Sequence, residues 1–109
     1  MTDSHDPMVV STRWDDATAV IVVEGELDLH ASPKLTAAVE QMLSDGPRAV
    51  EVDAGGLTFA DSAGLRALLM ARNEAEKRGT DLRLVRVSEP LDRLLEMTGL
   101  REVLGVAMT

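Results

Sequence analysis

Four consecutive β-branched residues at positions 20–23, Val-Ile-Val-Val, constrain the fold more than any other feature of the chain. A segment with apolar side chains on both faces is typical of a strand buried in the middle of a sheet. The apolar run that contains these residues is far too short to cross a bilayer. A strand-like segment at 9–14 precedes it, and Asp15 and Asp16 supply a turn, so the pattern predicts a hairpin between 9–14 and 17–24.

Three segments with apolar residues at helical spacing follow the hairpin. Including the residues expected to begin and end each helix, the three segments are 32–46, 62–78 and 88–99. Ser32 is expected to accept an unpaired backbone N–H at the first helix, where Pro33 suits the first helical position. Ser88 is expected to cap the third helix and Gly99 to end it. The methionines expected to lie in the core are Met42, Met70 and Met97.

Strand-like segments separate the expected helices. They are 49–53, followed by a turn at 55–56, then 82–87, and finally a short strand or tail at 103–106. A helix between successive strands implies right-handed crossovers and parallel pairing, and the first hairpin adds an antiparallel edge. The sequence therefore predicts one α/β domain over 9–109, with a mixed sheet of four or five strands covered by helices, after a flexible N-terminus at 1–8.

Charge and composition narrow the classes of function. The net charge is −8, and no basic stripe is present, so neither nucleic acid nor an anionic membrane surface is an expected partner. A protein with a basic patch fits this charge better. The chain has no cysteine, which excludes disulfides and thiolate chemistry, and residues 1–7 do not resemble a secretory signal. We expect a cytoplasmic protein.

The segment with the most chemical information joins a strand to the second expected helix. Asp61 is a natural N-cap, which places the Ser62 hydroxyl in the first helical turn and near solvent. Unpaired N–H groups and the helix dipole would tolerate a phosphate there. The small residues Ala63 and Gly64 would leave room for a kinase to approach. On spacing alone, however, a plain helix cap is the favoured reading.

Three segments, found in order along the chain, carry a resemblance to a known family. Residues 52–65 resemble the phosphoacceptor region of STAS domains, specifically of the anti-sigma factor antagonists. Residues 25–33 resemble the loop that leads from the central strand of these domains into their first helix, and residues 91–100 resemble their third helix. The resemblance covers about residues 9–106 and implies a single STAS-like domain.

The resemblance also implies a mechanism. In that family an anti-sigma factor that is also a serine kinase phosphorylates the serine after the aspartate, which is Ser62 here. The unphosphorylated antagonist binds that kinase and frees the sigma factor, and a serine phosphatase restores it. The implied partner-binding residues are Glu26, Asp28, His30, Ser32, Asp61, Ser62, Ala63 and Gly64. Many members carry Ser or Thr at the position of Ala63, a departure that leaves the acceptor in place.

The implied protein is not an enzyme, needs no cofactor or metal, and is a monomer or at most a weak dimer. A metal site built on Asp28 and His30 lacks a third ligand in sequence. A hydrolase with Ser62 as its nucleophile is disfavoured for two reasons. Its nucleophile elbow would need glycine where Ala60 stands, and its histidine would have to be His30, which precedes Ser62, whereas in such hydrolases the histidine follows the serine in the chain. The alternative function is a non-switching STAS subunit of a larger complex, such as a lipid-transporter accessory subunit or a stress-signalling scaffold.

Overall fold

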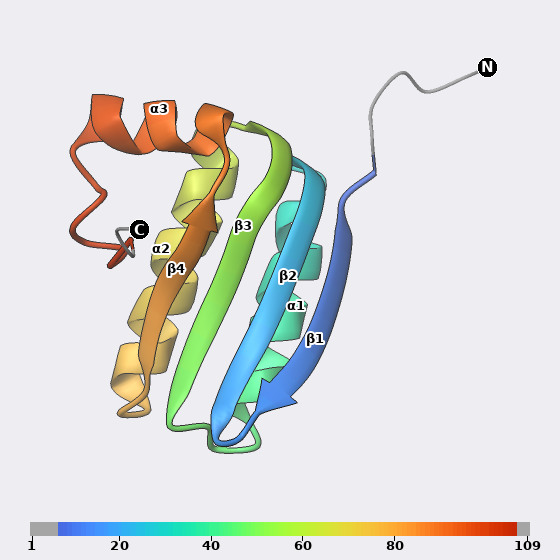
Figure 1. Ribbon diagram of the computed structural model, residues 1–109, viewed down its shortest axis with the longest axis vertical. Coiled ribbons are helices and arrows are strands. Elements are labelled where there is room, and N and C mark those ends of the chain that lie inside the picture. The colour runs from blue at the N-terminus through green and yellow to red at the C-terminus, as the bar shows by residue number, and fades with distance from the viewer. Residues whose placement is uncertain (1–6, 107–109) are drawn as a thin grey trace.

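The computed structural model describes residues 7–106, which form four strands and three helices (Figure 1). In chain order they are β1 (Val9–Asp15), β2 (Thr18–Leu27), α1 (Ser32–Leu43), β3 (Ala49–Ala60), α2 (Ser62–Lys77), β4 (Asp81–Val87) and α3 (Glu89–Thr98). Most of the segment expected to be a flexible N-terminus, residues 1–6, lies outside the described residues. Met8, in contrast, is buried, and its carbonyl accepts a hydrogen bond from Lys34 Nζ at 2.9 Å.

The strands form one mixed sheet in the order β1-β2-β3-β4. Strand β1 pairs with β2 antiparallel, whereas β2 with β3 and β3 with β4 are parallel. The β-branched run therefore lies in an inner strand, where Ile21 and Val23 have no exposed surface. The predicted α/β fold with a mixed sheet is confirmed.

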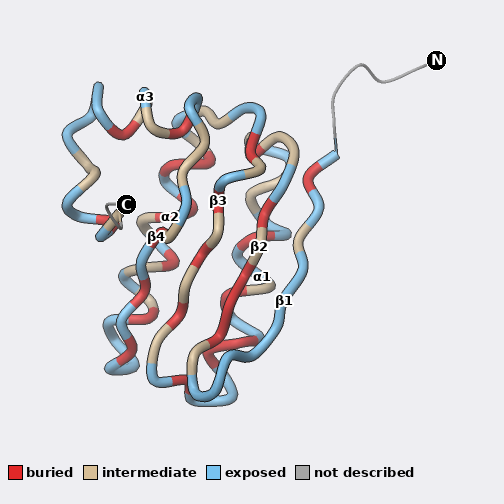
Figure 2. The backbone as a smooth tube through the Cα atoms, viewed as in Figure 1, coloured by how far each residue is buried: buried red, intermediate tan, exposed pale blue. Residues whose placement is uncertain are grey.

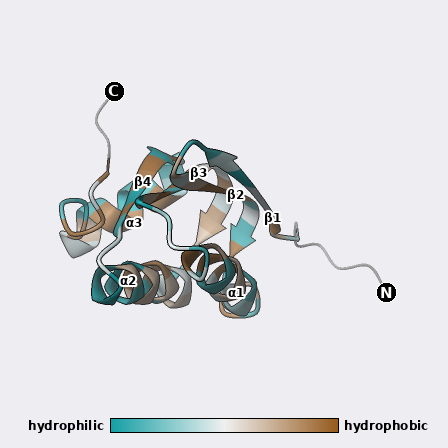
Figure 3. Cartoon of the chain, turned by 90° about the horizontal axis from the view of Figure 1, so that it is seen from below, coloured by the Kyte–Doolittle hydropathy of each residue, from teal (hydrophilic) through white to brown (hydrophobic). Residues whose placement is uncertain are grey.

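Helices α1 and α2 lie side by side against one face of the sheet (Figure 3). Their buried side chains meet those of the strands in one core, which Figure 2 shows as red segments on both layers. Residues with no exposed surface in this core include Leu35 of α1, Leu68 of α2, and Val52 of β3. Helix α3 packs near the carboxyl ends of β3 and β4 through Leu91 and Leu95. None of the three helices covers the opposite face of the sheet.

Strand β3 is much longer than the sequence predicts. The expected turn at 55–56 is wrong, because the strand continues through both glycines to Ala60. Pairing with the extended β2 outweighs the local preference of Gly-Gly for a turn, and the ladder accommodates it with register shifts. Gly56 has a steric reason to be glycine, since a Cβ there would lie 2.8 Å from the Glu24 side chain.

Of the two alternatives expected for residues 103–106, a short strand or a tail, the structure shows no strand: residues 101–105 form turns, Leu104 is buried, and its carbonyl accepts a hydrogen bond from the Leu84 N–H of β4 at 3.2 Å. The expectation for the methionines is wrong in part. Met42 is buried as expected, but Met70 and Met97 are 58% and 83% exposed. Both lie on the outer sides of helices whose inner sides Leu and Ala already fill. Ser88 does hold the N-cap position of α3, although its hydroxyl makes no capping bond.

Candidate partner-binding site

The candidate site forms where strands β2 and β3 end together. Leu27 and Ala60, their last residues, are partners in the parallel ladder. The Asp61 N–H then donates to the Leu27 carbonyl at 3.3 Å, so the chain leaving β3 stays against the chain leaving β2. Because the carboxyl ends of parallel strands share one edge of a sheet, the loop at 28–31 and the start of α2 lie side by side.

Asp61 caps helix α2 as predicted. Its backbone is extended, with φ −118° and ψ −175°, and its Oδ1 accepts the Gly64 N–H at 2.9 Å. Ser62 is consequently the first helical residue, and its side chain is exposed. The hydroxyl therefore stands at the positive end of a helix of 16 residues, in contact with solvent.

Gly64 is required by a close approach between α2 and β2. It is buried, and a Cβ at this position would lie 2.5 Å from the Leu27 carbonyl oxygen. The first turn of α2 therefore presses directly on the last residue of β2. The sequence suggested that Gly64 leaves room for a kinase, but the structure shows that the space it saves lies inside the protein.

The loop that faces Ser62 is held by Asp28. Its Oδ1 accepts the Ala31 N–H at 2.9 Å, and its carbonyl accepts both the N–H and the hydroxyl of Ser32. The prediction that Ser32 accepts a backbone N–H is wrong. Ala31 takes the N-cap position of α1, and the Ser32 hydroxyl acts as a donor. Its Oγ also approaches the Ala63 carbonyl at 3.4 Å, which connects the loop to α2.

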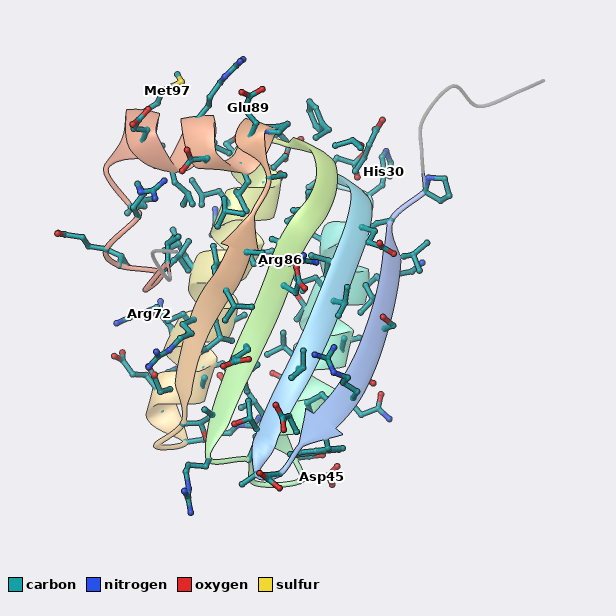
Figure 4. All side chains as sticks on the ribbon, viewed as in Figure 1. His30, Asp45, Arg72, Arg86, Glu89 and Met97 are labelled. Carbon is teal, nitrogen blue, oxygen red and sulfur yellow. The ribbon has the colours of Figure 1, made fainter. Side chains whose placement is uncertain are left out.

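Exposure separates the predicted site residues into two groups. Ser62 and His30 are exposed, and Figure 4 places His30 near the same end of the sheet as Glu89 at the start of α3. The other predicted site residues are partly or fully buried, and they are Glu26, Asp28, Ser32, Asp61, Ala63 and Gly64. The structure thus brings all the predicted residues to one end of the sheet, where Ser62 and His30 offer the most accessible side chains.

An apolar groove between α1 and α2 extends from this site, and the sequence did not reveal it. Its lining is Leu29, Ser32, Pro33, Thr36, Ala37, Ala63, Arg66, Ala67 and Met70. Leu29 and Met70 are 69% and 58% exposed at its border. The sequence pattern that could have indicated this groove is the spacing of Ser62, Arg66 and Met70. It places the three residues on one helical stripe opposite the buried residues of α2.

The part of the chain that the structure describes offers no obvious metal site or membrane span. No group of three or more His, Cys, Asp or Glu side chains is close enough there to hold an ion. Asp28, which the sequence paired with His30, uses Oδ1 for the Ala31 N–H. No helix between residues 7 and 106 combines the length and apolar character needed to cross a bilayer.

Residues 10–106 match the model of a protein family described as Mlab, STAS domain. This match spans most of the chain, and the protein therefore belongs to the STAS domain family. Among its relatives, the anti-sigma-B factor antagonist of Staphylococcus aureus is 29% identical over 97 residues, which cover 89% of this chain and 90% of the relative. The family predicted from the three motif segments is confirmed.

Solved structures agree on the fold. An anti-sigma factor antagonist from Mycobacterium paratuberculosis superposes with a TM-score of 0.83 at 24% identity, covering 94% of this chain and 86% of that one. The unphosphorylated form of the anti-sigma factor antagonist SpoIIAA superposes with a TM-score of 0.75, also at 24% identity, covering 92% and 89%. The four-stranded mixed sheet with three helices is thus an architecture shared with anti-sigma factor antagonists.

Proposed function

We propose that this domain is an anti-sigma factor antagonist that is switched by phosphorylation of Ser62. The observation that carries the proposal is the exposed Ser62 hydroxyl in the first turn of α2, beside the loop at 28–31. A relative named as an anti-sigma-B factor antagonist, matched over nearly its whole length, supports the same role. The partner is an anti-sigma factor with serine kinase activity, and a serine phosphatase reverses the modification.

The proposed reaction transfers the γ-phosphoryl group of ATP to Ser62 Oγ and releases ADP and the hydroxyl proton. The antagonist supplies only the acceptor, and the kinase supplies nucleotide, metal and catalytic groups. Ser62 suits this role because its side chain is accessible and the helix dipole favours negative charge at its position. The antagonist is therefore a substrate and a binding partner, not an enzyme.

The unmodified site is suited to a cationic partner surface. Glu26, Asp28 and Asp61 bring three carboxylates to this end of the sheet, and the whole chain has a net charge of −8. Opposite charge accelerates encounter and orients the two proteins. The exposed Ser62 and His30 would then make contact at the centre of the interface, with Ser32, Ala63 and Gly64 supporting the backbone around them.

Phosphorylation ends binding at the interface and leaves the fold intact. Phosphoserine adds about −1.5 to −2 charges at pH 7. In the free domain this charge stays in solvent, whereas in the complex it would have to be desolvated against a surface shaped for a hydroxyl. A penalty of about 3 kcal/mol weakens binding roughly a hundredfold, which is enough to return the kinase to its sigma factor.

The modification is tested by incubating the protein with each candidate anti-sigma factor kinase and ATP, followed by intact mass. We expect the mass of one phosphoryl group on the wild type and no gain on Ser62→Ala. Calorimetry with the same kinase should show that Ser62→Ala binds constitutively. If no kinase modifies the wild type, or if Ser62→Ala is modified equally, the switch at Ser62 is refuted.

The contribution of the loop can be separated from its folding. Asp28→Asn keeps an oxygen that can accept the Ala31 N–H but removes the charge. We expect it to weaken kinase binding while its thermal unfolding stays close to that of the wild type. Asp28→Ala loses both the charge and the acceptor and serves as the comparison. Kinase binding that is equal for Asp28→Asn and the wild type would remove Asp28 from the proposed interface.

A second candidate function is a non-switching subunit of a larger assembly, such as a lipid-transporter accessory subunit or a stress-signalling scaffold. The observation that favours it is the matching family model, which is described as Mlab. Such a subunit would form a lasting complex that ATP does not dissolve. Isolation of the tagged protein with and without ATP and phosphatase separates the two: a complex that persists unchanged supports the subunit, and one that depends on phosphorylation supports the switch.

A further inference from the structure

Arg66 lies one helical turn after Ser62 on the same exposed stripe of α2. Side chains four residues apart in a helix are neighbours, and helical side chains lean toward the N-terminus, so the Arg66 guanidinium can reach back to residue 62. Within residues 7–106 the arginines that pair with carboxylates are Arg72, Arg78, Arg83, Arg86, Arg93 and Arg101. Arg66 belongs to none of these ion pairs.

We propose that Arg66 is the internal counter-ion of phosphorylated Ser62, binding the phosphate oxygens through an ion pair within the first two turns of α2. This inference rests on the proposed function, since it concerns the modified state of the same serine. The order of charges, anion first and cation four residues later, is the favourable one for a helix. A guanidinium is also the side chain best matched to phosphate geometry.

The pair would extend the effect of phosphorylation beyond Ser62. Arg66 lines the apolar groove between α1 and α2, close to Ala63 and Met70. In the unmodified protein its guanidinium is available to a partner that occupies the groove. In the phosphorylated protein it turns toward residue 62, so one modification changes both the charge at the helix start and the wall of the groove. No movement of the backbone is required.

The test uses protein with phosphoserine incorporated at position 62 during translation, so that no kinase is needed. The ³¹P NMR signal of the phosphate is followed from pH 4.5 to 8, where the group passes from one negative charge to two. Arg66 favours the doubly charged form, so Arg66→Gln should raise the titration midpoint by about 0.3 pH unit. Arg66→Lys should give an intermediate value.

Lys77→Gln is the matched control, because it removes one positive charge from the far end of the same helix, where Lys77 is also exposed. Its midpoint should equal that of the wild type. A high salt concentration should reduce the difference in midpoint between the wild type and Arg66→Gln measured at the same salt, because salt screens an exposed pair. An unchanged midpoint in Arg66→Gln, or an equal shift in Lys77→Gln, would overturn the inference. Failure of every kinase to modify Ser62 would refute the proposed function instead and leave this measurement unaffected.

Discussion

Leu68 and Ser62 belong to the same helix, fewer than two turns apart, yet Leu68 has no exposed surface and Ser62 is exposed. The stripe that faces the sheet consists of Leu and small residues, because every side chain there must fit against the strands and α1. The stripe that faces solvent carries a hydroxyl, a guanidinium and a thioether at 62, 66 and 70. Packing thus constrains one side of α2, and the other side is available for recognition.

This contrast predicts which property each substitution changes. A change on the inner stripe should lower the free energy of unfolding and affect binding only through loss of the folded domain. A change on the outer stripe should alter binding with little effect on unfolding. Gly64 lies between these cases, because it is close to Ser62 in sequence but touches the backbone of Leu27.

The largest effect is expected from Leu68→Ala. Removing a fully buried leucine side chain leaves a cavity between α2 and the sheet, and such changes cost about 2–5 kcal/mol of unfolding free energy. Urea unfolding followed by circular dichroism measures the loss. Met70→Ala, on the outer stripe, is the control and should change the unfolding free energy by less than about 0.5 kcal/mol. Equal losses would show that the two stripes do not differ as the structure indicates.

Ser62→Asp should produce the opposite result on the same helix. Its negative charge should weaken kinase binding by about a hundredfold, in line with the penalty proposed for phosphoserine. Stability should stay the same or rise slightly, because an acidic residue in the first turn interacts well with the helix dipole. Calorimetry and thermal unfolding of the same preparation give both values. Binding as tight as that of the wild type would mean that Ser62 is only part of a helix start.

Gly64→Ala should behave like a core substitution despite its position in the candidate site. The new Cβ would lie 2.5 Å from the Leu27 carbonyl oxygen, so either α2 or the end of β2 must move, at a cost of about 1–3 kcal/mol. Gly79→Ala provides the comparison, because a Cβ there meets nothing within 4 Å and the cost arises only from φ +73°. Gly64→Ala should in addition weaken kinase binding, whereas Gly79→Ala should not.

The element types were predictable because they follow from local chemistry, whereas the location of the candidate site came from the resemblance to STAS domains, since spacing alone favoured a plain helix cap. The β-branched run predicted the inner strand, and Asp61 predicted the start of α2 together with the exposure of Ser62. The lengths of β2 and β3 were not predictable in this way. Residues 55–56 favour a turn by themselves, and only pairing between two strands that are distant in sequence keeps them extended.

Side-chain roles at the site were harder to predict than its position. Asp28 takes the acceptor role that was expected of Ser32, because the turn before α1 uses the Asp28 carboxylate and leaves the Ser32 hydroxyl as a donor. The exposure of Met70 and Met97 depends on which side of each helix the sheet covers. The sequence pattern contained this information for Met70, since it repeats the spacing of Ser62 and Arg66, but a methionine is ordinarily assigned to the core.

The smallest expected effect concerns the sheet face that the helices leave uncovered. Asp53 of β3 lies there opposite Arg86 of β4, and both Asp53 oxygens accept hydrogen bonds from Arg86 Nε at 3.1 Å. Partial burial raises the pKa of Asp53, but the hydrogen bonds from Arg86 and from the Gly55 N–H, with the charge of Arg86, outweigh it and leave the pKa below its usual value of 3.8. Folding therefore favours the ionised carboxylate.

The lowered pKa of Asp53 defines a pH window for its contribution to stability. This contribution is complete above the usual pKa and is lost as the pH falls below 4, through the pKa of the folded state. Arg86→Gln should therefore reduce the stability difference between pH 7 and pH 3, measured as the shift of the urea midpoint. Arg83→Gln is the control, because it removes a positive charge from the same strand. Arg83 pairs with Asp81 rather than with Asp53, so this substitution should leave the Asp53 contribution in place. The effect should be small because Arg86 is exposed to solvent and salt screens such pairs. A pH dependence that is the same in Arg86→Gln and the wild type would show that this pair contributes nothing measurable.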